Sequence, residues 1–131
     1  MRTKFSLPFE DAQTVATACL EAARHHEVEV SIAVVDDAGV LLHFSRMDGA
    51  RAYTVEIASQ KARTSASVGV ATSVIEAMYR ERPAPSRESN VGRGGVPIPY
   101  QGQCAGAVGV SGATPEIDEI IAQAGVAVLT A

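Results

Sequence analysis

Three charged side chains near the middle of the chain could carry acid–base chemistry. Glu56, Lys61 and Arg63 fall in a segment of small and polar residues that we predict to be a helix, roughly 53–67. A lysine and a carboxylate that face one pocket can move protons on an enol or enamine substrate. Glu56 and Lys61 do not have the i,i+4 spacing of a helical ion pair, and a solvated helix face is the alternative interpretation.

Two arginines lie where they could bind a carboxylate. Arg46 closes a predicted strand before a turn that contains Asp48, and it could either pair with Asp48 or hold a ligand carboxylate through two hydrogen bonds. Arg93 stands directly before Gly94 and Gly95, where backbone amides could also point at an anion. These arginines and glycines are therefore candidate ligand-binding residues.

His43 is a candidate ligand-binding residue. It lies in the stretch LLHFS on a predicted strand, on the same face as Leu41 and Ser45. A half-buried, hydrogen-bonded histidine is the ordinary role at such a position, and contact with a ligand is the alternative. His25 and His26 end the predicted first helix, where polar or positive side chains suit the negative end of the helix dipole.

A run of glycines at positions 102, 106, 109 and 112 directly precedes a predicted helix and raises the question of a phosphate site. The run matches neither GxxxxGK[ST] nor GxGxxG. The following helix begins with Glu116, Asp118 and Glu119, whose negative charges would repel a phosphate. We therefore expect the glycines to serve close packing against the small residues of the 53–67 helix.

The elements that must position these residues follow from periodicity and turn signals. Apolar residues recur at helical spacing over 10–26 and 115–129, and shorter helices are expected over 53–67 and 73–80. Two strands flank the turn at 36–39, and two more flank 101–102. The order α-β-β-α-α-β-β-α indicates an α+β layered domain with a central antiparallel sheet flanked by helices. Residues 80–95, with four arginines, are predicted to be a loop or lid.

Composition excludes several classes of protein. The chain has 131 residues, which suits one domain over 1–131, and its formal net charge of −4 without a basic tract argues against a nucleic-acid partner. Only Cys19 and Cys104 are present, in no zinc-type spacing, so that a disulfide framework is not expected. The sequence shows neither a secretory signal nor a membrane-length apolar run, and we expect a soluble, cytoplasmic protein without a membrane partner.

Five collinear motifs resemble one protein family across nearly the whole chain. They are RMDGA (46–50), KART (61–64), GGVP (94–97), GVSGA (109–113), and DE (118–119) followed by AGVAVL (124–129). Together they resemble the GlcG/HbpS-like haem-binding family, which is related to the C-terminal domain of the propanediol-utilisation adenosyltransferase. The resemblance implies a profilin-like fold and a homo-oligomer, either a dimer or a higher assembly of dimers. It also implies that the helix carrying Lys61 and Arg63 borders a pocket between subunits.

The resemblance implies two functions that stay open. The first is a small-ligand-binding domain for haem or another tetrapyrrole. His43 would then be the candidate axial ligand for the iron, although no metal ligand can be transferred from the shared motifs. The second is a cofactor-independent enzyme of tautomerase or hydrolase type that acts on a small carboxylated metabolite of aromatic catabolism. In that case Arg46 and Arg93 would hold carboxylates while Glu56 and Lys61 move protons. The arginine-rich loop favours an anionic ligand, although haem propionates would also use arginines.

Overall fold

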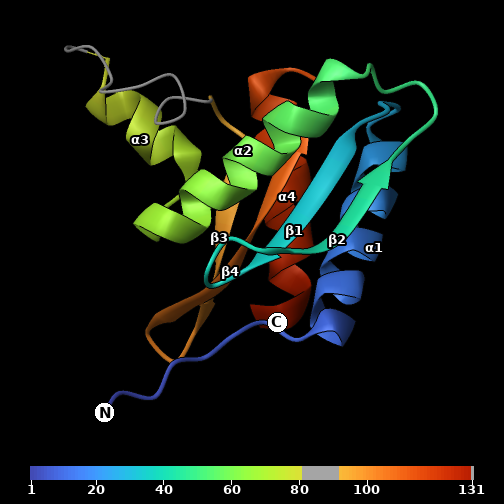
Figure 1. The fold of residues 1–131 in the computed structure, drawn as a ribbon. Helices are drawn as coiled ribbons and strands as arrows, with labels where there is room; N and C mark the ends of the chain where they lie inside the picture. The colour runs from blue at the N-terminus through green and yellow to red at the C-terminus, as the bar shows by residue number, and fades with distance from the viewer. Residues whose placement is uncertain (81–91, 131) are drawn as a thin grey trace.

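The structure, a computed structural model, describes residues 1–80 and 92–130. Its elements are α1 (Phe9–His25), β1 (Ser31–Asp36), β2 (Leu41–Arg46), α2 (Tyr53–Val68), α3 (Thr72–Met78), β3 (Gly95–Tyr100), β4 (Gln103–Ser111) and α4 (Pro115–Thr130). This order confirms the predicted α+β fold (Figure 1). The loop prediction for 80–95 lies mostly outside the described residues, and Gly95 already belongs to β3.

Local sequence explains where the elements begin and turn. Asp36 accepts hydrogen bonds from the N–H groups of Ala38 (2.9 Å) and Val40 (3.0 Å), which closes the turn between β1 and β2. Gln101 and Gly102 both have positive φ, as the two central residues of a tight hairpin turn require. At the start of α4, the Thr114 hydroxyl accepts the N–H of Ile117 at 3.3 Å.

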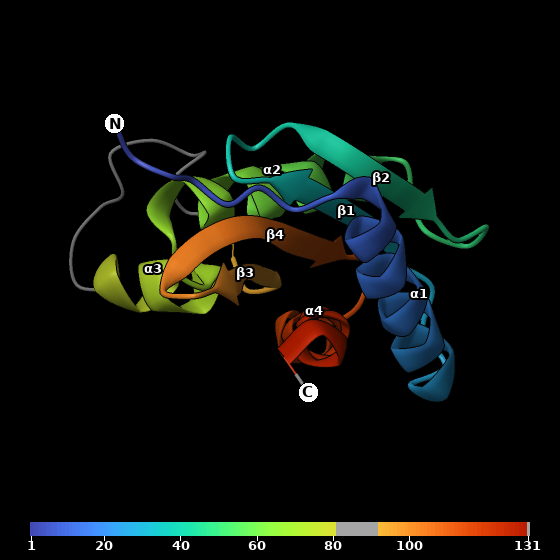
Figure 2. The same cartoon turned by 90° about the horizontal axis from the view of Figure 1, so that it is seen from below.

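One antiparallel sheet forms the middle layer, in the strand order β2-β1-β4-β3. Figure 2 shows α1 and α4 on one side of this sheet and α2 on the other. The strands β2 and β3 are the two edges. Since neighbouring strands lie about 4.8 Å apart, three spacings separate the two edges by about 14 Å.

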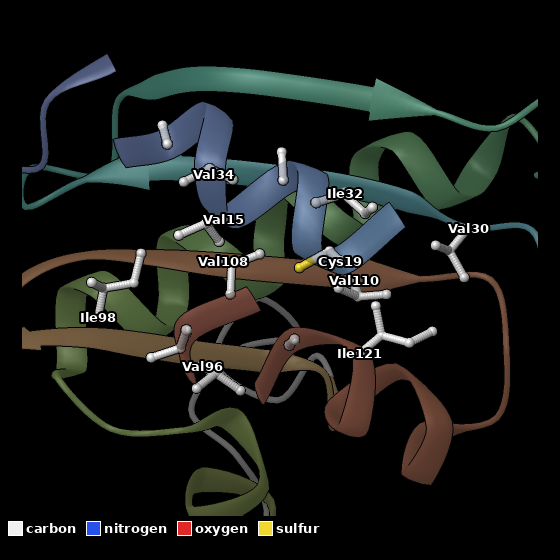
Figure 3. Packing of buried hydrophobic residues seen from close by; sticks show 14 of the residues in the cluster. Val15, Cys19, Val30, Ile32, Val34, Val96, Ile98, Val108, Val110 and Ile121 are labelled. Carbon is white, nitrogen blue, oxygen red and sulfur yellow. The ribbon is translucent and has the colours of Figure 1, made fainter. Parts of the chain in front are cut away.

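Alternation along β1 divides the core between the two faces of the sheet. Val30, Ile32 and Val34 pack with α1 and α4, as the labelled side chains in Figure 3 show. Ala33 and Val35 pack with α2 on the other face. The first cluster holds the larger side chains, and full burial of each valine or isoleucine contributes about 1.5–3 kcal/mol.

Close packing of α2 on β4 confirms the interpretation for one glycine of the run, Gly109. A side chain at Gly109 would collide with the backbone oxygen of Ala58 and come within 2.6 Å of the backbone nitrogen of Ala62. Small residues on α2 therefore allow the helix backbone to approach the strand directly. A side chain at Gly106 would meet Leu7 and the backbone of β1, one at Gly112 would meet Glu29 and Val30, and Gly102 is a turn residue with open space around it.

Cys104 departs from the alternation of side chains along β4. Strict alternation would put it on the same face as Val108, but its sulfur points toward the backbone oxygen of Ala66 in α2, at 4.0 Å. The register between β3 and β4 shifts between Ile98 and Pro99, and this irregularity reverses the alternation at the start of β4.

Candidate functional site

Several of the sequence motifs meet at one place, where α2, the start of β3, the end of β4 and the start of α4 come together. We call the residues Lys61, Gly94, Gly95, Val110 and Asp118 the buried junction. Lys61 is only 4% exposed, and its ammonium donates to the Val110 carbonyl at 2.8 Å and to Asp118 at 3.2 Å. The interpretation of this lysine as part of a solvated helix face was therefore wrong, because Lys61 lies on the face of α2 that packs on β4.

Asp118 completes the junction from α4. One carboxylate oxygen meets Lys61, and the other accepts the N–H of Ala113 at 2.9 Å. Burial raises the pKa of Asp118 above its usual range, although Lys61 and the Ala113 amide act in the opposite direction. Burial likewise lowers the pKa of Lys61, against the attraction of Asp118. The pair ties the start of α4 to the end of β4 and to α2.

Gly94 and Gly95 belong to the same junction as packing residues. A Cβ at Gly94 would lie 3.0 Å from the Lys61 ammonium nitrogen and 2.6 Å from the Val110 carbonyl oxygen, and the φ of Gly94 is +124°. The Gly95 N–H donates to the Thr72 hydroxyl at 3.0 Å. These contacts occupy the space around the two glycines, whose predicted ligand-binding role stays a prediction.

Arg93 lies beside the junction and is engaged by carboxylates of this chain. Its Nε–H donates to Glu119 at 3.0 Å, and Glu116 lies 4.0 Å from its guanidinium. Burial would raise the pKa of Glu119, but hydrogen bonds from Ser73 and Arg93 outweigh it, so that this pKa lies below its usual range. A ligand carboxylate at Arg93 would have to displace Glu119.

Glu56 and Arg63 lie elsewhere, on the outer face of α2. They form an ion pair with each other at 3.0 Å, and their side chains are 65% and 49% exposed. The acid–base hypothesis requires Glu56 and Lys61 at one pocket. The structure does not bring Glu56 to the buried Lys61.

His43 and Arg46 lie together on β2, at the opposite edge of the sheet. The His43 Nε2 atom shares a hydrogen bond of 2.9 Å with the Ser45 hydroxyl, and His43 is half-buried. Ser45 and Arg46 line a cavity of about 380 Å³, together with Arg24 and Glu29. We call Arg24, Glu29, His43, Ser45 and Arg46 the open edge. The sequence offered two roles for Arg46, an ion pair with Asp48 or the binding of a ligand carboxylate. No ion pair between Arg46 and Asp48 forms in the described part of the chain.

The open edge contains residue types that a haem uses, but they do not surround one cavity. His43 is not among the residues that line the cavity of about 380 Å³. In the strand register His43 lies opposite Val34 on the α1 face, and Arg46 lies opposite Ser31, which bonds to Thr54 of α2.

Haem brings four nitrogen ligands of its own, so that one imidazole such as His43 suffices as an axial ligand. Arg24 and Arg46 are suited to the propionates, and Leu20 and Met47 add apolar surface to the cavity. Among residues 1–80 and 92–130, no cluster of three or more His, Cys, Asp or Glu could hold a metal ion by itself. At the buried junction, the side chains of Lys61 and Asp118 are each 5% exposed.

Sequence reasoning missed two features of these sites. It placed Asp118 only at the start of a helix, since nothing local indicates that a carboxylate 57 residues away reaches Lys61. It also passed over Arg24, an exposed residue near the end of α1. The shared motifs KART and DE could have indicated the contact between Lys61 and Asp118. No signal in the sequence indicated Arg24.

No helix in the described part of the chain is both long and apolar enough to cross a membrane.

Comparison with known proteins places the chain among relatives from bacteria. Protein GlcG from Escherichia coli K12 is 40% identical over 116 residues, which cover 85% of each chain. An uncharacterised 15.0 kDa protein from the dhaT–dhaS intergenic region of Citrobacter freundii is 31% identical over 119 residues, or 86% of this chain and 84% of that protein.

Solved structures show the same fold. Klebsiella pneumoniae protein ORFY matches with a TM-score of 0.93 and 28% identity, covering 100% of this chain and 95% of that chain. A double mutant of HbpS from Streptomyces reticuli matches with a TM-score of 0.89 and 34% identity, over 98% and 90% of the two chains.

A structure of PduOC in complex with haem matches with a TM-score of 0.85 and 27% identity, over 93% of this chain and 94% of that one. The family model described as "Haem degrading protein HbpS-like" matches residues 7–127. The fold, the collinear motifs and this match agree, and the chain belongs to the HbpS-like family.

Proposed function

We propose that this chain binds haem or another tetrapyrrole at the open edge. The observation that carries the proposal is the similarity to PduOC, a protein whose structure holds haem on the same fold over 93% of this chain. The family description and the likeness to HbpS add support.

The residue types at the open edge support this location. In the proposal, His43 ligates the iron through its ring, and its hydrogen bond to Ser45 sets the orientation of that ring. Arg24 and Arg46 bind the propionates from the cavity that they line. Haem would supply a redox-active iron. The chain's own contribution is to bind and orient the macrocycle.

A haemin titration of the purified protein, followed by the visible spectrum, tests the proposal. We expect a saturable Soret shift near one equivalent, which His43→Ala abolishes and Arg46→Ala weakens by about fivefold to tenfold. His25→Ala is the matched control, because His25 is exposed at the end of α1. Cys104→Ala tests the half-buried thiol as an alternative ligand.

Two results would contradict the proposal in different ways. A featureless, non-saturating titration would remove haem as the ligand. A wild-type spectrum in His43→Ala would keep haem but move its site away from the open edge.

The enzymatic alternative draws less support from the geometry. It requires Glu56 and Lys61 at one pocket, whereas Glu56 pairs with Arg63 on the outer face of α2. The expected homo-oligomer and cytoplasmic location stay predictions. Exposed apolar side chains on α3 and α4, among them Met78 and Ile120, support association between copies.

A further inference from the structure

A second cavity lies at the other end of α1, in a region that none of the sequence motifs indicated as a site. It has a volume of about 400 Å³ and opens between the N-terminal segment, the end of β3 and the end of α4. Its walls are mainly apolar, with Phe5, Leu7, Ile98, Tyr100 and Leu129 among them. Cavities of this size and character are typical of small-molecule sites. We call it the N-terminal cavity.

The N-terminal segment is held in place and forms a stable wall. The Leu7 N–H donates to the Ala105 carbonyl at 2.9 Å, and the Phe5 N–H donates to the Gln103 side chain at 3.1 Å. Leu7 is 6% exposed and belongs to the main core. The rings of Phe5 and Tyr100 meet edge to face, with centroids 4.8 Å apart. The cavity is therefore a built feature of the fold.

The charge in this cavity indicates which ligand it would take. Asp11 lines it, and the Asp11 carboxylate has no ion pair with another residue in the described ranges. No lysine or arginine is among the described residues that line it. Tyr100 is 50% exposed, and the face of an aromatic ring attracts a cation. A carboxylate beside aromatic and apolar walls suits an ammonium group on an apolar body.

We propose that the N-terminal cavity binds a small organic ammonium compound with an aromatic or aliphatic body, separately from the haem site. Asp11 pairs with the ammonium group, and Phe5, Tyr100 and Leu129 cover the apolar part. Arg24 lies thirteen positions after Asp11 along α1, which is about 20 Å at 1.5 Å per residue. The two sites therefore do not overlap.

The test uses two probes of similar shape and opposite charge, 2-phenylethylamine and 3-phenylpropanoate, at neutral pH. Binding is followed by amide chemical shifts of the full chain. We expect the amine to saturate with a Kd of about 1 mM and to shift amides around Leu7, Asp11 and Tyr100. The carboxylate should bind at least about tenfold more weakly.

Asp11→Asn separates charge from shape. It should weaken amine binding by about tenfold and remove the preference over the carboxylate. Glu10→Gln is the matched control, because Glu10 is the neighbouring carboxylate on α1 and does not line this cavity. Haemin titration of Asp11→Asn should match the wild type, so that failure here is distinct from failure of the haem proposal.

Four results would overturn the proposal. They are the lack of saturation up to about 10 mM amine, shifts confined to residues outside the cavity, equal affinity for both probes, and an Asp11→Asn variant that binds the amine as the wild type does.

Discussion

The buried junction and the open edge both contain cationic side chains, yet the two regions use them differently. At the junction, Lys61 meets Asp118, and next to it Arg93 meets Glu119. At the open edge, Arg46 is exposed and forms no ion pair with another described residue. The difference teaches that a cationic side chain paired with a carboxylate of the same chain stabilises the fold. A cationic side chain that is exposed beside a cavity is available to bind a ligand.

Burial explains why the junction must be so fully paired. Removing Lys61 and Asp118 from water costs several kcal/mol per charge, and only mutual pairing with further hydrogen bonds offsets it. The Val110 carbonyl and the Ala113 amide supply those further bonds. At the open edge water solvates the charges, so the chain loses little by leaving them unpaired.

The largest expected effect comes from breaking the buried pair on one side. Lys61→Met keeps most of the side-chain volume but leaves the Asp118 carboxylate without its cation. We expect the free energy of unfolding to fall by about 3–5 kcal/mol, measured by urea denaturation.

Arg46→Met is the matched control for this prediction, since it removes a cation from the open edge. It should lower the free energy of unfolding by less than about 0.5 kcal/mol. Equal losses in the two variants would show that the distinction between the two regions is not energetic.

A smaller effect is expected from adding one methyl group at each region. Gly95→Ala would place its Cβ against the Lys61 backbone oxygen and 2.7 Å from the Thr72 methyl. Neither the backbone of α2 nor this short side chain can move away easily. We expect a loss of about 2 kcal/mol in the free energy of unfolding, from overpacking.

Gly49→Ala supplies the comparison at the open edge. Its Cβ would meet the carboxylate of Glu29, the far end of a flexible side chain that can swing into solvent. A loss below about 1 kcal/mol is expected from thermal or urea denaturation, and a loss as large as that of Gly95→Ala would contradict the rigid packing inferred at the junction.

The smallest effect concerns the pH dependence of stability. The pKa of Glu119 is lower in the folded chain than in the unfolded one, because Ser73 and Arg93 donate hydrogen bonds to the carboxylate against the cost of its burial. Its stabilising contribution is therefore fully present above the unfolded pKa of about 4.3 and is lost as pH falls through the folded value.

Denaturation of wild type and Glu119→Gln between about pH 2 and 7 checks this sign. The difference in free energy of unfolding between them should be constant above about pH 5 and shrink toward acid. A difference that grows toward acid would mean that Glu119 is not stabilised in its charged form.

Periodicity and turn chemistry were enough to predict the layers of this fold. The apolar stripe of α1, the Asp36 turn and the paired positive-φ residues Gln101 and Gly102 are local features, and each agrees with the structure. The orientation of Cys104 was beyond local reasoning, because an irregular register between two strands reversed the alternation there.

The candidate sites were only partly predictable for the same reason. Lys61, Arg93 and the two glycines were chosen as ligand-binding or catalytic residues, and the structure brings them together with Asp118 and Glu119. Arg46 was expected to act with Arg93 and Lys61, and His43 was a separate candidate for iron ligation. The strand order places both Arg46 and His43 on β2, across the width of the sheet from the junction.

The sequence by itself determined the element order, the division of β1 into two buried faces, and the need for small residues where α2 approaches β4. Those properties depend on the periods of helix and strand, which are written in neighbouring residues. Tertiary structure alone decided which charges meet. The Lys61–Asp118 pair spans 57 positions, and the separation of His43 from Lys61 follows from the order of the strands. Charge pairing acts over a few ångströms in space, and distance along the chain carries no information about it.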